Sequence, residues 1–148
     1  MPVPEKQKTF AVVGDGRKCL ILENTGPDWE PKFMVIDEII GTPKAQTTGP
    51  SGRRADTGQG QRSAMEVADA GDEVRRRLAA SVADRLGTYH RKARFQRLML
   101  AAPPAMLGAL RTAMPGNLTR AITLEFPSDL VHHTVDQIDQ AFQRAKNA

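Results

Sequence analysis

One stretch of the chain, residues 49–65, concentrates side chains that could bind RNA or assist ester hydrolysis. It reads GPSGRRADTGQGQRSAM and combines three arginines with a Gly-Gln-Gly-Gln run: Arg53, Arg54 and Arg62, and Gly58, Gln59, Gly60 and Gln61. Arginines on such a loop are suited to contact RNA phosphates. We therefore expect a binding loop, with a disordered insertion rich in Gly, Ser and Arg as the simple alternative.

Positive charge is concentrated in the same part of the sequence. The net charge is +4, and residues 53–97 hold eleven Lys or Arg against six Asp or Glu, an excess of five that leaves one net negative charge elsewhere. Arg75, Arg76 and Arg77 follow the loop on a predicted helix, where consecutive side chains point about 100° apart, so at least two must be solvated or bound. This asymmetry favours RNA or the ribosome as partner, and a solvated helix face is the alternative.

Metal-dependent nuclease chemistry is disfavoured because it needs clustered carboxylates. The runs TFAVVG (9–14) and FQRLMLAA (95–102) have the length of strands and contain no acid, and Asp15 follows the first run in an Asp-Gly pair. An aspartate in that position is usually the turn residue of a hairpin. The sequence therefore predicts no metal site.

Nucleophilic and cofactor chemistry have no stronger candidates. Cys19 lies in the apolar run CLIL and is expected to be a buried structural thiol. The three histidines, His90, His132 and His133, are expected to be exposed, and none has ligand spacing to Cys19 or to a carboxylate pair. The segment GDGRKCL lacks the glycine spacing of a dinucleotide-binding loop, so no cofactor is predicted. These residues favour a binding protein over an enzyme.

The first half of the chain reads as a meander followed by a loop and a helix. An Asp-Gly turn joins strands at 9–14 and 17–24, and a third strand follows at 32–40. Residues 43–68 show no apolar periodicity and are predicted to be a loop. The helix that follows should be capped by Asp69 or Asp72, and its buried face is expected to contain Val74, Leu78, Val82, Leu86 and Tyr89.

The second half alternates strands and helices. A buried strand at 95–102 precedes a helix that begins at Pro103-Pro104 and ends at Pro115-Gly116. A fifth strand at 120–126 precedes a last helix that starts with a capping box formed by Thr134 and Gln137.

This order of elements predicts an α/β fold. The first three strands should form an antiparallel meander, and the two late strands, joined by a helix, should be parallel with a right-handed crossover. The expected result is a mixed five-stranded sheet in the order 3-2-1-4-5 with helices on its faces, a ribonuclease H-like layout.

Length and composition fit a single domain over residues 1–148, with a flexible loop at about 43–68. No apolar run approaches the roughly 18 residues that span a bilayer, and the N-terminal segment MPVPEKQKTF lacks the apolar core of a secretory signal. We expect a cytoplasmic protein that does not associate with membranes.

Four segments, spread from Phe10 to Phe142, carry a family resemblance. They are FAVVGDGRKCLILENTG, DTGQGQRSAM, FQRLMLAAPPAMLGALR and ITLEFPSDLVHHTVDQIDQAF, and the element AAPPAMLGALR followed by a strand and Asp-Leu is the most specific of them. Together they resemble the bacterial host attachment protein family, named for a role in attachment to host cells. The family is similar to the archaeo-eukaryotic release factors, which implies a fold like the central domain of those factors.

The release-factor resemblance also bears on chemistry. In those factors a Gly-Gly-Gln tip on the loop before the long helix helps water attack the peptidyl-tRNA ester. Residues 58–61 occupy a comparable place but read Gly-Gln-Gly-Gln, and 148 residues leave no room for separate codon-reading and partner-binding domains. The resemblance therefore implies a non-enzymatic RNA- or ribosome-associated protein.

Two other functions stay open. One is an attachment-related factor that acts directly or indirectly on cell-surface adhesion, and the other is a release-factor-like peptidyl-tRNA hydrolase. The third strand is expected at a sheet edge, where it can pair with a second copy to form a homodimer.

Overall fold

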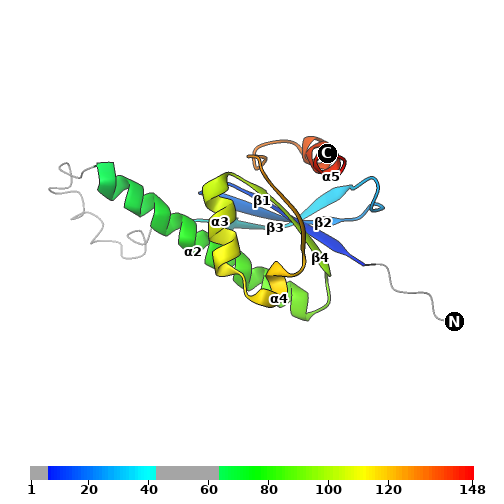
Figure 1. The fold of residues 1–148 in the computed structure, drawn as a ribbon, viewed down its shortest axis with the longest axis horizontal. Coiled ribbons are helices and arrows are strands. Elements are labelled where there is room, and N and C mark those ends of the chain that lie inside the picture. The colour runs from blue at the N-terminus through cyan, green and yellow to red at the C-terminus, as the bar shows by residue number, and fades with distance from the viewer. Residues whose placement is uncertain (1–6, 43–63) are drawn as a thin grey trace.

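The computed structural model describes residues 7–42 and 64–148. Within these ranges five strands form one sheet in the order β3-β2-β1-β4-β5, with helices on both of its faces (Figure 1). The strands are β1 (Thr9–Gly14), β2 (Lys18–Asn24), β3 (Phe33–Ile40), β4 (Arg97–Ala102) and β5 (Ile122–Pro127). The helices are α2 (Ala64–Arg91), α3 (Pro104–Ala113), α4 (Gly116–Thr119) and α5 (Val135–Lys146). The predicted fold class and strand order are confirmed.

The pairing directions also follow the prediction. β1 pairs antiparallel with β2, and β2 pairs antiparallel with β3, with a register shift between Ile21 and Leu22. β1 pairs parallel with β4, and β4 pairs parallel with β5. The sheet is therefore an antiparallel meander joined to a parallel half, and β1 lies between the two.

Every residue of β1 is buried, and its side chains divide between two cores. Phe10 and Val12 belong to the core formed with α2, α3 and α4. Ala11 and Val13 belong to the core formed with α5 and its preceding loop, where Ile138 and Phe142 are buried. This alternation is what a strand covered on both faces requires.

The turn between β1 and β2 confirms the interpretation of Asp15. Its Oδ1 accepts hydrogen bonds from the backbone N–H groups of Arg17 (2.8 Å) and Lys18 (2.9 Å). The preceding Gly14 must lack a side chain, because a Cβ there would lie 2.4 Å from the Sγ of Cys19. The carboxylate of Asp15 therefore holds the hairpin turn.

The start of α2 differs from the expectation. The helix begins at Ala64, so Asp69 and Asp72 lie inside it and neither is its cap, and the expected loop ends earlier than residue 68. The first turns of α2 extend beyond the sheet (Figure 1), so apolar periodicity begins only where the helix reaches the core. Ala and Met, which stand at its start, both have high intrinsic helix propensity.

Two other helix boundaries were only partly anticipated. Pro103 caps α3 and Pro104 is its first residue, as expected. Beyond Pro115, however, the chain forms the short helix α4, whose Leu118 is fully buried. At α5 the capping box is confirmed, since Gln137 N–H donates to Thr134 Oγ1 (3.2 Å) and Thr134 N–H donates to Gln137 Oε1 (3.0 Å).

β3 is the outer strand of the meander and exposes Met34, Val35 and Ile40. Two of its backbone donors are already satisfied by carboxylates. Phe33 N–H donates to Asp139 Oδ1 of α5 (2.8 Å), and Glu38 N–H donates to Asp37 Oδ1 (2.9 Å). These bonds occupy part of the strand edge that a second copy would need. Dimerisation through β3 stays a prediction.

In the described ranges, no helix combines the length and the hydropathy needed to cross a bilayer.

Asp139 gives the fold a testable dependence on pH. Its side chain is 8% exposed, and burial raises the pKa of its carboxyl above the ordinary 3.8, while the Phe33 N–H and the charge of Lys32 oppose that rise. The folded protein therefore holds this proton more tightly than the unfolded chain does. The stabilisation is complete below the unfolded pKa and is lost as pH rises through the folded one.

We expect Asp139→Asn to flatten the dependence of unfolding free energy on pH above about pH 4, measured by urea denaturation. Asp129→Asn removes one negative charge from an exposed position just before α5 and serves as the control. Parallel curves for wild type and Asp139→Asn would contradict this account.

Candidate functional site

The residues predicted to bind RNA fall into two groups. Those of the loop lie outside the described residues: Arg53, Arg54 and Arg62, and the tip Gly58, Gln59, Gly60 and Gln61. The other three, Arg75, Arg76 and Arg77, lie on α2. None of these three is buried in the core.

Two of the three helix arginines have carboxylate partners on α2 itself. Arg75 is paired with Asp72, and Arg77 is paired with Glu73 (2.7 Å) and also donates to the carbonyl of Thr42 (3.2 Å). Arg76 is exposed and has no carboxylate within 4.0 Å among the described residues. Exposed ion pairs within a helix contribute only about 0–1 kcal/mol, so an incoming phosphate can replace them.

A groove runs between α2 and α3, and we call it the α2–α3 groove. It consists of two hollows of about 380 and 560 Å³ that share Ala113. Eight of the fifteen residues that line it are alanine, glycine or serine: Ala80, Ser81, Ala83, Gly87, Ala105, Gly108, Ala109 and Ala113. Side chains this small let the backbone of a partner approach both helices closely.

Arginines stand at both ends of the α2–α3 groove. Arg76 lines one hollow and Arg91 lines the other. They are fifteen positions apart on α2, which is about 22 Å along the axis and about 60° around it, so they lie on one side of the helix. Two acids also line the groove, Asp72, which is paired with Arg75, and Asp84.

More positive charge gathers where α2 ends. Asn117 of α4 lies 3.5 Å from His90 Nδ1, so the segment that carries Arg120 is held against the end of α2. We call His90, Arg91, Lys92 and Arg120 the α2-end cluster. Within the described part of the chain, Arg91, Lys92 and Arg120 have no carboxylate within 4.0 Å. No sequence pattern pointed to this cluster, because Arg120 is brought to it by the packing of α4.

His132 and His133 are exposed, as expected, whereas His90 is not. The side chain of His132 is 75% exposed, and its Nε2 lies 3.7 Å from Oδ2 of Asp15. His90 is half-buried, and its ring lies 5.2 Å from that of Phe95. The Asp15–His132 separation exceeds hydrogen-bond distance. In residues 7–42 and 64–148, no group of three or more His, Cys, Asp or Glu is placed to hold a metal ion.

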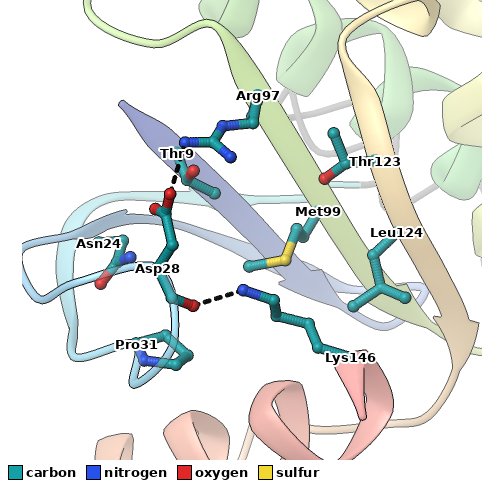
Figure 2. Close-up of a pocket in the computed structure, with 9 residues that line it drawn as sticks. All are labelled: Thr9, Asn24, Asp28, Pro31, Arg97, Met99, Thr123, Leu124 and Lys146. Carbon is teal, nitrogen blue, oxygen red and sulfur yellow. Dashed lines mark hydrogen bonds and ion pairs between the residues drawn. The ribbon is translucent and has the colours of Figure 1, made fainter. Parts of the chain in front are cut away.

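A polar pocket of about 250 Å³ lies on the opposite face of the sheet, beside the end of α5 (Figure 2). Arg97 Nη2 is paired with Asp28 Oδ2 at 2.8 Å, and Lys146 Nζ donates to the carbonyl of Asp28. Thr9, Asn24, Pro31, Met99, Thr123 and Leu124 complete the lining. The sequence did not indicate this site, since its residues come from five elements and one loop.

Cys19 is fully buried, as predicted. Burial, together with the nearby charge of Asp15, raises the pKa of its thiol from 9.0 to about 12. Only the thiolate is a good nucleophile, so the native thiol should be inert near neutral pH.

We expect native Cys19, the only cysteine of the chain, to react with a thiol reagent at pH 8 at least a hundredfold more slowly than it does in urea. A thiolate population lowered about a thousandfold, together with blocked access, accounts for the difference. Rapid labelling of the folded protein, followed by mass spectrometry, would contradict the burial described here.

Comparisons with known proteins place the chain in a family. The family model described as "Protein required for attachment to host cells" matches residues 10–141. Among curated proteins, "Uncharacterized protein RP470" of Rickettsia prowazekii (strain Madrid E) is 35% identical over 54 residues, which span 36% of each chain.

Two solved structures are similar over 95% of this chain. They are an archaeal translation termination factor, aRF1 (TM-score 0.49, 10% identity), and a structure described as "Archaeal protein" (TM-score 0.48, 12% identity). The chain spans 39% and 37% of these two proteins. Because the family model covers most of its length, the chain belongs to the family of proteins required for attachment to host cells.

Proposed function

We propose that this protein is a non-enzymatic, cytoplasmic RNA-binding protein that associates with the ribosome. The observation that carries the proposal is a set of three arginines and one lysine that have no carboxylate partner among the described residues, one beside the α2–α3 groove and three near the end of α2. Arg76, Arg91, Lys92 and Arg120 make up this set. Cations that the protein itself does not neutralise are available to phosphates.

The α2–α3 groove supports the same proposal through its shape. Its small side chains separate Arg76 from the α2-end cluster, so a strand that follows the groove can place phosphates near both. Positive side chains that track a backbone give binding without sequence preference. The paired Arg75 and Arg77 can join the contact by exchanging Asp72 and Glu73 for phosphate.

The loop arginines fit this arrangement by their position in the chain. Arg53, Arg54 and Arg62 precede α2, whereas the α2-end cluster lies at the other end of that helix. The proposal therefore assigns RNA contacts along the whole length of α2. No residue in it is given a catalytic role.

We expect salt-dependent binding to purified ribosomes, measured by co-sedimentation over a series of salt concentrations. Replacing Arg91, Lys92 and Arg120 together by Ala should weaken binding at least tenfold. It should also reduce the slope of log K against log salt by about two to three, at roughly 0.7–0.9 for each phosphate that the variant no longer neutralises. The Arg53, Arg54 and Arg62 triple alanine variant should behave in the same way.

A matched control removes three other cations that lack carboxylate partners in the described part of the chain: Arg17, Lys32 and Arg144. Arg17 lies in the β1–β2 turn and Arg144 on α5, so the control has the same net charge with α2 intact. If both test variants sediment like the control and the wild type, the ribosome proposal is wrong.

A second candidate function comes from the family description, which names attachment to host cells. We propose that such a role is indirect, with the protein acting inside the cell on the production of adhesins or surface polysaccharide. The unpaired cations of α2 would then serve attachment through an RNA contact.

We expect loss of the gene to reduce host-cell attachment severalfold, while the protein itself is recovered in the cytoplasmic fraction. Wild type should restore attachment, and the variant with Ala at Arg91, Lys92 and Arg120 should not. Recovery of the protein at the cell surface, or full rescue by that variant, would favour direct attachment instead.

A further inference from the structure

The polar pocket beside α5 brings two cations to Asp28, one to its carboxylate and one to its backbone carbonyl. Arg97 stands at the start of β4 and Lys146 at the end of α5, and Asp28 lies between them on the loop that joins β2 to β3 (Figure 2). Asp28 is the sole acid among the described residues that line this pocket. The site therefore has a positive charge that Asp28 does not balance.

Asp28 accepts a hydrogen bond from only one nitrogen of the Arg97 guanidinium. Its Oδ2 accepts from Nη2 at 2.8 Å, and the carbonyl of Gln7 accepts from the same nitrogen at 3.4 Å. Nε of Arg97 is buried and has no hydrogen-bond partner among the described residues. A guanidinium binds a carboxylate best through two parallel N–H···O bonds, so the present single contact leaves Arg97 undersatisfied.

The rest of the pocket offers both apolar side chains and two hydroxyl groups. Met99 and Leu124 lie on the sheet beneath the two cations, and Thr9 and Thr123 flank Arg97 (Figure 2). The volume of about 250 Å³ equals that of roughly eight water molecules at about 30 Å³ each. This suits a short aliphatic chain with one charged end better than it suits a bare inorganic ion.

We propose that this pocket binds a small organic carboxylate. The acid group of the ligand takes the place of the Asp28 carboxylate on Arg97, in the pocket that Lys146 also lines, and its hydrocarbon part lies on Met99 and Leu124. Asp28 thus acts as an internal substitute for the acid group of the ligand. This inference does not depend on RNA binding, which uses the other face of the sheet.

The loop permits this exchange without unfolding. Its base is fixed, because Oδ1 of Asn24 accepts from the N–H groups of Gly26 and Lys32 at 2.9 Å each. Thr25 N–H also donates to the carbonyl of Lys32 (2.8 Å). Asp28 lies between these anchored residues, and its side chain is 43% exposed. A rotation of that side chain into solvent is enough to free Arg97.

The test titrates the full-length protein, free of RNA, with hexanoate and, separately, with inorganic phosphate, and follows backbone amides by NMR. We expect hexanoate to shift the resonances of residues around Thr9 and Thr123, with a dissociation constant at least tenfold lower than that of phosphate. Lys146→Ala should weaken hexanoate binding at least fivefold, and Arg97→Gln should do so more strongly. Asp28→Asn, which removes the internal competitor, should strengthen it severalfold.

Arg144→Ala is the matched control, because Arg144 is an exposed cation in the same last turn of α5 and does not line the pocket. Lys146 is exposed at the helix end, so its variant tests the site even if Arg97→Gln folds poorly. Equal binding of phosphate and hexanoate, hexanoate shifts that Lys146→Ala leaves unchanged, or weaker binding by Asp28→Asn would each overturn the proposal. Absence of any hexanoate shift would overturn it as well.

Discussion

β1 has every residue buried and lies between an antiparallel and a parallel neighbour. A strand in that position needs cover on both faces, because its alternate side chains point in opposite directions. Phe10 and Val12 therefore require the layer formed by α2, α3 and α4, whereas Ala11 and Val13 require α5. The neighbouring β4 repeats the requirement through Leu98 and Leu100 on one side and Met99 on the other. The α2–α3 groove lies within one of these helical layers. The polar pocket lies where the other layer, α5, meets the sheet.

The packing of the two helical layers also decides which charged side chains have an ion-pair partner within the protein. Arg85 of α2 is paired with Asp37 of β3 at 2.5 Å, and Tyr89 donates to the same carboxylate at 3.1 Å. Arg111 of α3 is paired with Glu125 of β5. These contacts fasten the helices to the outer strands. They also pair the carboxylates of Asp37 and Glu125 with helix arginines. Among the cations without a carboxylate partner in the described residues, Arg76 and Arg91 line the groove between α2 and α3, and Lys92 and Arg120 lie near the end of α2.

On the other face of the sheet, α5 covers less of the strands than α2, α3 and α4 together cover on the first face (Figure 1). Asp139 fixes α5 to β3 by accepting the N–H of Phe33, and Phe142 packs against Phe33 with ring centroids 5.2 Å apart. Held in this way, α5 ends near the starts of β1 and β4, where Lys146 meets Asp28. The space left there is the polar pocket (Figure 2). Its two cations come from residues 49 positions apart in the chain, which no local pattern connects.

The sequence by itself determined the strand order, the Asp15 turn, the buried thiol of Cys19, the proline start of α3 and the capping box of α5. Each of these depends on neighbours close in the chain or on periodicity, which reports which face of an element is buried. It misplaced the start of α2, because the first turns of that helix lie beyond the core and carry no apolar period. It also missed α4, the approach of His132 to Asp15, the α2-end cluster and the pocket. Only the tertiary structure decided these, because each depends on side chains from separate elements meeting at one point, and sequence spacing carries no information about where packed layers end.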